Sequence, residues 1–423
     1  MIAISAGAAL SLNIPDWGRW TLAGTAVAGI SALGIAVLIG PAANRLAGER
    51  HPLTQVERQQ MTATERVEAV NAARHTLIQA ATGLVVIGGV VFTGQGLWYT
   101  AQSLDASRQA QRTAEQGQIA DRYTKAVEQI GSGTLDVRLG GMYALERLAQ
   151  DSPRDHQTVY DVLAAFIREH DPKPTIKAAK LSAQPATDVQ AALTIIGRRN
   201  TRLDAHMPDL SNIRAPGANL TRATLTDTNL SDATLTDTNL TGANLTGADL
   251  FRADVRDANL SDANLFSADV RGANLSDAYL TGAYLSDANL TGATLTDTNL
   301  TGANLTGADL FRADLRGATL TYANVRGAKL TYADLTGAKL TDTNLRGADL
   351  TDTNLSDATL SGADLTGADL SGATLTGAYL SGANLTGATL TGATLTGANL
   401  TGISGMTQKA IRAVAIVDDK TKF

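Results

Sequence analysis

The residue types that most often do chemistry are sparse in this chain and are not grouped. The 423 residues include no Cys, which excludes disulfides and thiolate metal sites. No His lies in an HExxH motif or has carboxylates at ligand spacing, so we predict no metal site, no cofactor and no catalytic residues. The five histidines are spread over four segments, at His51, His75, His156, His170 and His206.

A glycine-containing segment at residues 131–141 offers the second chemical possibility, a phosphate-binding loop. It holds Gly131-Ser132-Gly133 and Gly140-Gly141, but it follows a helical pattern and lacks the Lys-Ser/Thr pair of a P-loop. A turn between two helices is therefore the favoured interpretation. The charged residues around it are interpreted as surface ion pairs: Asp136, Arg138, Glu146 and Arg147.

A five-residue repeat from Pro216 to Leu400 organises the chain. From Leu220 to Leu400 every fifth residue is Leu or Val, and the residue two places earlier is Ala or, in five quintets, Thr. A period of five builds no apolar stripe on an α-helix and puts successive Leu on opposite faces of a strand. It suits a coil that turns a corner in each quintet, with Leu and Ala pointing inward and small polar residues at the corners.

The quintets resemble those of pentapeptide-repeat proteins, as in Ala243-Asn244-Leu245-Thr246-Gly247 and Ala308-Asp309-Leu310-Phe311-Arg312. The resemblance implies a mainly β fold, a right-handed quadrilateral β-helix with four quintets, or 20 residues, in each coil. The segments 241–255 and 301–315 differ only in their last residue and lie a whole number of such coils apart. Pro is absent after Pro216, which fits a stacked β-coil because Pro deletes a backbone donor.

The inward positions of this solenoid leave no room for a substrate, so its outer surface is the candidate site. Phe and Arg interrupt the Thr-Gly pattern just after the quintet centres, where their side chains are expected to face outward. Exposed aromatic residues and Arg are typical contact residues of protein interfaces, although they also cover corners and balance Asp ladders. The candidate partner surface comprises Phe251, Arg252, Arg256, Phe266, Arg271, Phe311, Arg312, Arg316, Arg326 and Arg346.

Two uncharged runs near the N-terminus predict a membrane hairpin, with helices at about residues 20–43 and 77–100 in a domain of residues 1–104. Each run is long enough to cross about 30 Å of hydrocarbon, and Trp17, Trp20 and Trp98-Tyr99 suit the interfacial belt. A buried helical hairpin in a soluble protein is the alternative. Two spans place both ends of the chain on one side. Arg counts lean towards a cytoplasmic loop, yet the repeat region is expected in the cytoplasm because nothing marks it for export.

Helical patterns fill residues 105–200. The second span continues to about Ile130, with Ile119, Tyr123, Ala126 and Ile130 on one seam that suits a coiled coil or packing against neighbouring helices. Two further helices are expected before a linker at 172–186, and one after it, which Thr187 or Asp188 is expected to cap. The segment 118–171 is similar to the juxtamembrane region of membrane-anchored pentapeptide-repeat proteins of actinobacteria.

The remaining boundaries follow from the repeat. Residues 201–404 form the β-helix, with 202–215 as an irregular first coil, and residues 405–423 form a capping helix begun by Thr407 and a tail. The chain is then a non-enzymatic, multi-pass protein of the bacterial cell membrane. It contacts lipid through two helices and presents a rigid rod to an unknown protein, not to nucleic acid.

The alternative function comes from soluble relatives that resemble DNA and modulate DNA gyrase or topoisomerase. From Pro216 to Leu400 there are 20 Asp, no Glu and 10 Lys or Arg, within an overall net charge of −6. DNA carries about one charge per 1.7 Å of its axis, which is denser than this mixed surface. The anchored interaction protein is therefore favoured over the DNA mimic.

Overall fold

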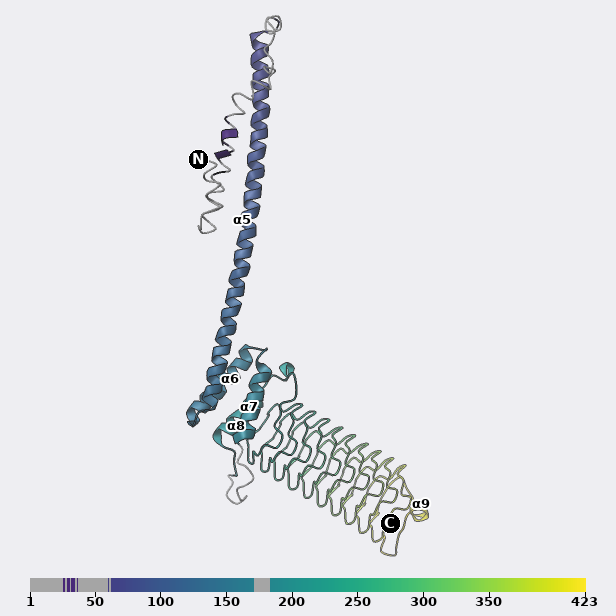
Figure 1. The fold of residues 1–423 in the computed structure, drawn as a ribbon. Coiled ribbons are helices and arrows are strands. Elements are labelled where there is room, and N and C mark those ends of the chain that lie inside the picture. Colours follow the sequence, from purple (N-terminus) through teal and green to yellow (C-terminus); the bar gives the residue numbers. More distant parts are fainter. Residues whose placement is uncertain are drawn as a thin grey trace. The chain divides into compact units, whose positions relative to one another are not determined.

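The computed structural model describes residues 62–170 and 183–423, together with isolated positions between Ala26 and Gln60. The chain divides into two units, Met1–Glu115 and Gln116–Phe423. Most of the predicted first membrane helix at about 20–43 and most of the predicted linker at 172–186 lie outside the described residues. Figure 1 shows the fold.

Helix α5 (Ala63–Ile130) is one continuous helix of 68 residues, which confirms the predicted helix that runs to Ile130. It begins with a capping box. The Thr62 amide donates to the Glu65 carboxylate (2.9 Å), and the Glu65 amide donates to the Thr62 hydroxyl (3.4 Å). These reciprocal bonds satisfy amides that have no partner within the helix, and they hold the pKa of Glu65 below its usual value.

The C-terminal end of α5 packs with three shorter helices, α6 (Leu135–Asp151), α7 (His156–His170) and α8 (Thr187–Ile196). Ala126 and Ile130 are buried in their common core, and Ile119 and Tyr123 pack against it. The seam predicted on α5 therefore packs within this helical region. The core of α6 to α8 is contributed mainly by Met142, Leu145, Val159, Leu163, Ile167, Leu193 and Ile196.

The ion pairs of this region differ from those expected at the surface. Arg138 binds Asp188 (Nη2–Oδ2 2.7 Å), whose side chain is 5% exposed, and Glu146 lies 3.7 Å from Arg198. The prediction that Thr187 or Asp188 caps α8 is wrong. Ala186 stands at the N-cap without a side-chain bond, because the Asp188 carboxylate is already held by Arg138 from 50 residues away.

Helix α6 approaches α5 closely at Gly141. A Cβ atom at this position would stand 2.7 Å from the Ala126 carbonyl oxygen and 3.0 Å from the Ile130 amide nitrogen, both backbone atoms. A Cβ atom added at the neighbouring Gly140 would have no atom within 4 Å. The two glycines therefore serve as a test and a matched control for this packing.

We expect Gly141→Ala to destabilise the helical region by about 1–3 kcal/mol, because the two helices must separate to admit the methyl group. Gly140→Ala should stabilise it by up to about 1 kcal/mol, since it only removes a glycine from a helix interior. Thermal unfolding of the two variants, followed by circular dichroism, measures both changes. Equal effects at the two positions would contradict this packing.

The repeat region is a stack of square coils that pairs each residue with the one 20 positions later. The pairs are isolated parallel bridges, and the described residues contain no extended strand. The predicted mainly β architecture therefore consists of single bridge residues. Each five-residue side has one bridge residue, and the turn at the corner takes up most of the others. We name the sides by their first bridge: face A (Asp209↔Asn229), face B (Arg214↔Thr234), face C (Asn219↔Asn239) and face D (Thr224↔Asn244).

Every amide of a typical quintet has a partner. In the quintet at Leu240, the Leu240 amide donates to the Asn259 carbonyl in the next coil (2.7 Å), and the Asn239 amide donates to the Ala218 carbonyl in the previous one (2.9 Å). The Thr241 amide has no backbone acceptor and donates instead to the Asn239 side chain (3.1 Å). Asn or Asp before the centre therefore completes the hydrogen bonding of the corner.

The corners explain the glycines of the repeat. In each turn the residue two places after the centre has positive φ, as in Gly242 (63°), and the next amide bonds back to the centre carbonyl, as in a type II turn. Gly and Asp fill most of these places because they tolerate this backbone. The inner Leu and Ala side chains are nearly all buried, and Thr298, Thr343 and Thr353 donate to carbonyls inside the shaft.

Both ends of the stack are covered, as Figure 1 shows for α8 and for α9 (Gln408–Val414). At the N-terminal end, Arg199 is buried and donates to the Thr224 and Thr226 carbonyls and to Asp204. At the C-terminal end, the Thr407 hydroxyl caps α9 as predicted, and Ile411 is buried in the core. Residues after α9 return to the stack through the bridges Thr394↔Ile416 and Asn399↔Lys422.

The predicted irregular first coil at 202–215 is only partly coil. It opens with the 3-10 helix η3 (Thr201–Leu203), and the first bridge is at Asp209. Asp204 in this segment accepts from His156 (3.0 Å) and from Arg199 (2.8 Å), and burial beside this network raises the pKa of Tyr160 to about 12. In this segment, polar contacts to α7 thus take the place of the repeated Leu and Ala.

Candidate interaction surface

The ten predicted surface residues lie on three of the four corners of the stack. Corner A–B, which follows face A, carries five of them, while corners B–C and D–A carry the rest. On corner A–B these are Phe251, Arg252, Arg271, Phe311 and Arg312; on corner B–C, Arg256 and Arg316; on corner D–A, Phe266, Arg326 and Arg346. The structure therefore gathers half of the predicted site on one edge of the rod and separates the other half.

Phe251 is the centre of the first cluster on corner A–B. Its ring is 36% exposed, and the guanidinium carbons of Arg252 and Arg271 lie 5.8 and 5.4 Å from its centroid. The Phe251 backbone amide donates a hydrogen bond to the Asp249 carboxylate (2.8 Å), which fixes the corner at this residue. Two cations within about 6 Å of one ring make a cation–π cluster at the surface.

Phe311 forms a second cluster three coils further along the same corner. Arg312 lies 4.9 Å from its ring centroid and 5.9 Å from that of Tyr332, and the two rings meet edge to face at 5.8 Å. Sequence reasoning missed Tyr332. The signal was present, because Tyr332 follows Arg312 by 20 residues and so stacks directly on it.

Arg256, Arg271 and Arg316 are held by carboxylates of their own quintets. Each binds the Asp two places earlier through two nitrogens, as in Arg316 Nε–Asp314 Oδ1 (2.8 Å) and Nη2–Oδ2 (2.6 Å). The bond from Arg316 holds the pKa of the Asp314 carboxyl below its usual value, and the same holds for Asp269 beside Arg271. These arginines mainly neutralise Asp, which the Asp-x-Arg spacing in the sequence already indicated.

Corner D–A holds the remaining three residues in looser contacts. Phe266 is 45% exposed and has no ring or cation–π partner among the described residues. Arg346 lies 3.3 Å from Asp364, whereas Arg326 makes no ion pair within the described part of the chain. As predicted, Arg326 and Arg346 are one coil apart.

Arg252 and Arg312 occupy strained backbone positions. Their φ angles are 57° and 56°, in the left-handed region where most quintets place Gly or Asp. For a side chain such as Arg, this conformation costs on the order of 1–2 kcal/mol. Strain retained beside an exposed aromatic ring points to a function for these side chains rather than to stability.

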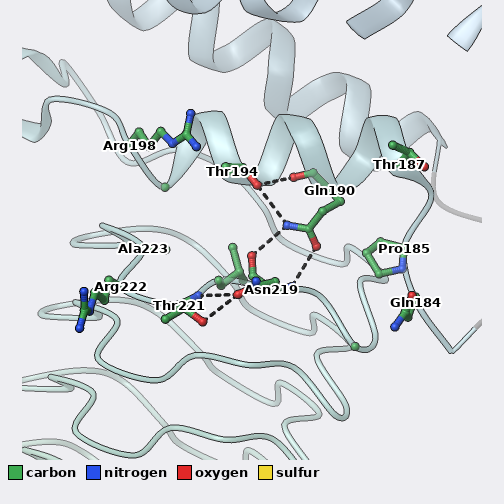
Figure 2. Close-up of a pocket in the computed structure, with 13 residues that line it drawn as sticks. Gln184, Pro185, Thr187, Gln190, Thr194, Arg198, Asn219, Thr221, Arg222 and Ala223 are labelled. Atoms are coloured by element: carbon green, nitrogen blue, oxygen red, sulfur yellow. Dashed lines mark hydrogen bonds between the residues drawn. The ribbon is translucent and has the colours of Figure 1, made fainter. Parts of the chain in front are cut away.

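The cavity in this unit lies where α8 meets the first coils, with a volume of about 600 Å³. Figure 2 shows that Gln190 reaches across it, donating to the Asn219 carbonyl (2.9 Å) and accepting from the Asn219 amide (2.9 Å). Arg198 and Arg222 are the charged residues of its lining, which contains no Asp, Glu, His or Ser. We interpret it as a gap beside the docked helix rather than as a reaction site.

Within residues 62–170 and 183–423, His, Asp and Glu form no group of three that is able to hold a metal ion. The absence of metals, cofactors and catalysis stays a prediction. One described helix, α5, is long and apolar enough to cross a membrane by length and composition.

The comparisons with known proteins agree on the repeat. A family model described as pentapeptide repeats matches overlapping segments that together span residues 209–402. The chain is 36% identical to HetL, a pentapeptide repeat protein involved in heterocyst differentiation regulation from the cyanobacterium Nostoc sp. strain PCC 7120. That match covers 51% of this chain and 87% of HetL, with a TM-score of 0.44. No curated protein matches the chain.

Two other solved structures are also similar. The chain is 38% identical to alr5209, a pentapeptide repeat protein from Nostoc PCC 7120, over 25% of this chain and 84% of that one, with a TM-score of 0.22. It is 23% identical to QnrB1, a plasmid-mediated fluoroquinolone resistance protein, over 43% of this chain and 88% of that one, with a TM-score of 0.25.

The stacked coils and filled shaft define a repeat solenoid whose outer surface is its only extended site among the described residues. Through residues 209–402, the chain belongs to the pentapeptide-repeat family.

We expect Arg312→Gly to leave the rod as stable as the unmodified chain or to stabilise it by about 1 kcal/mol, because glycine relieves the positive φ. Gly292 already fills this place one coil earlier on the same corner. Arg316→Gly is the matched control. It removes an arginine that binds the Asp314 carboxylate from a corner position without backbone strain, so it should not stabilise the rod. Chemical denaturation of both variants gives the two free energies of unfolding. A clear loss of stability in Arg312→Gly would show that this Arg serves the fold.

Proposed function

We propose that this protein is a non-enzymatic, membrane-anchored scaffold that presents its rod to a protein partner through corner A–B. The observation that carries the proposal is the pair of aromatic–arginine clusters on one edge of a rod without a cleft. The membrane helix, the cell-membrane location and the cytoplasmic side of the rod are parts of the same proposal.

Helix α5 supports the membrane part through its exposed apolar side chains and its satisfied hydroxyls. Leu84, Val85 and Val86 are 67%, 50% and 59% exposed, and as consecutive helical residues they point to different sides of the helix. The hydroxyls within this stretch donate to carbonyls four residues earlier, as Thr82 does to Ile78 and Thr93 to Gly89 (both 2.8 Å). Internal satisfaction of polar groups is what a lipid environment requires.

The rod supports the scaffold part because it offers a surface and little else. Its shaft is filled with Leu and Ala, and the bonds between coils fix the position of every corner. The Phe251 and Phe311 clusters lie three coils apart, or about 14 Å at the usual strand spacing. A partner that contacts both clusters would meet two aromatic anchors, each with Arg beside its ring, and binding hot spots are enriched in aromatic residues and Arg.

Membrane anchoring predicts that the full chain stays with membranes during an alkaline wash, whereas a chain lacking residues 1–104 is released. Extraction of the full chain would contradict the anchor. Sidedness has a built-in reporter, because many quintets read Asn-x-Thr or Asn-x-Ser, as at Asn239 and Asn299. Synthesis with endoplasmic-reticulum microsomes should leave a cytoplasmic rod unglycosylated, and glycosylation would place it on the other side.

The partner surface predicts a specific photo-crosslink from a probe at Phe311 in native membranes. The matched control is a probe at Thr391, which lies on the same corner four coils further along, away from both clusters. One reproducible adduct at Phe311 and none at Thr391 supports the scaffold. Equal labelling at both positions would show that corner A–B does not select a partner.

One observation favours the alternative, a DNA-like modulator of gyrase. Asp237, Asp257, Asp277 and Asp297 stack on successive coils of corner B–C. They present about one charge per 4.8 Å, against one per 1.7 Å in DNA, and the bound Arg256 and Arg316 interrupt them. Inhibition of gyrase supercoiling by the solubilised chain, lost on replacing these Asp by Asn, would establish the alternative instead.

A further inference from the structure

The four faces of the rod carry unequal charge. Within the ten repeat coils, faces A and B have several charged bridge residues each, whereas faces C and D have one each, Lys339 and Asp364. Face C also bears Tyr279 and Tyr379, which are 54% and 53% exposed. Lys339 makes no ion pair within the described part of the chain. The charged bridge residues of faces A and B are Asp209, Asp249, Asp269, Asp309, Lys329, Asp349, Asp369, Arg214, Asp254, Asp314 and Asp334.

We propose that face C pairs with face C of a second copy of this chain, with the two rods antiparallel. Face A, with six Asp and one Lys among its bridge residues, would repel its own copy, whereas face C has no such barrier. Its period also selects the occupant. Ten coils repeat at about 4.8 Å, so a surface of the same period can interlock at every coil, and another copy has that period by construction.

A twofold axis across the rods fixes which residues meet. We number the coils by their face C residues, from Asn219 (coil 1) to Asn399 (coil 10). When all ten coils overlap, coil 4 of one copy faces coil 7 of the other. Tyr279 then lies opposite Lys339 of the second copy, and the symmetry makes this contact twice. The one charge on face C thereby gains an aromatic partner.

The edge of face C along corner C–D is complementary in size in the same alignment. A crossing twofold axis lays this edge against the same edge of the second copy. The side chains at the left-handed positions of this edge then all meet glycines: Tyr322 faces Gly302, Asp342 faces Gly282, Asp262 faces Gly362, and Arg222 faces Gly402. No two side chains at these left-handed positions compete for the same space.

The other edge, along corner B–C, is largely complementary in charge. Asp237, Asp277 and Asp297 face Gly377, Gly337 and Gly317 of the second copy. Arg316 in coil 6 comes beside Asp297 in coil 5 of the other copy. The one like-charged pair, Asp257 with Asp357, has Arg256 next to it. Antiparallel pairing therefore dilutes the Asp ladder that a parallel arrangement would leave concentrated at one end.

The size of the face predicts a weak pair. Ten coils extend about 48 Å, and a side of five residues is roughly 10 Å wide, so the two copies together cover on the order of 1,000 Å². This is near the lower limit for a specific interface, so the pair should depend on concentration. Corner A–B is left uncovered, so the inference does not depend on the proposed function.

Disulfide trapping of the full chain tests the arrangement directly, because the chain has no Cys of its own. The variant Asn259→Cys with Thr359→Cys places thiols in coils 3 and 8 of face C, about 24 Å apart within one chain and beyond disulfide reach. We expect a covalent dimer on oxidation of the purified chain in detergent. The matched control on face A, Asp249→Cys with Asp349→Cys, should stay monomeric although it removes two repelling charges.

The single variants separate the possible outcomes. Asn259→Cys and Thr359→Cys alone should not dimerise, and self-linking by either would show a parallel pair. Adding Tyr279→Asn to the double variant should reduce trapping about tenfold, since it removes two cation–π contacts worth about 0.5–1 kcal/mol each without adding a charge opposite Lys339. Asn already fills this place one coil later at Asn299, so the coil accepts it. Tyr284→Asn, in the same coil but on face D, is the control and should have no effect. Failure of the folded double variant to dimerise would overturn the proposal.

Discussion

The hydrogen bonds between coils are the constraint on which the rest of this structure depends. Up to Ser404, each bridge joins residues 20 apart, so the position of a residue within its coil determines its place on the surface. A side chain's neighbours are then the residues 20 before and after it, together with those on its own corner. The inward Leu and Ala keep this relation constant by filling the shaft at every step. The residues that build the shaft are therefore distinct from those that form the surface.

This separation explains why the fold was easy to predict and the site was not. The five-residue period specified buried Leu and Ala and small residues at the corners, and the resemblance to pentapeptide-repeat proteins implied the 20-residue coil; all of these are seen. The grouping of the surface residues needed the position within the coil, which shows that Phe311, Arg312 and Tyr332 meet while Phe266 lies on another corner. Spacing along the sequence alone does not reveal this, because residues of neighbouring quintets lie on different corners.

The helical region shows the opposite behaviour. Its helices were predictable from apolar periodicity, but its polar contacts were not. Asp188 was expected to cap a helix and instead binds Arg138, which approaches from another helix. Arg199 similarly turns inward to bond the first coils. Such contacts depend on how helices pack, and no repeat constrains that packing, so local sequence patterns do not report it.

The deviations from the repeat hold most of the information about function. A rod built only for stability would place Gly or Asp at each left-handed position, yet Arg252, Arg312, Tyr322 and Tyr332 occupy four of them. Both of these arginines lie near Phe rings on corner A–B, and Tyr322 lies beside the nearly uncharged face C. The strain is thus concentrated where large side chains project from the surface. Because the hydrogen bonds between coils are strong enough to tolerate it, the rod can carry different contacts on different edges without altering its shape.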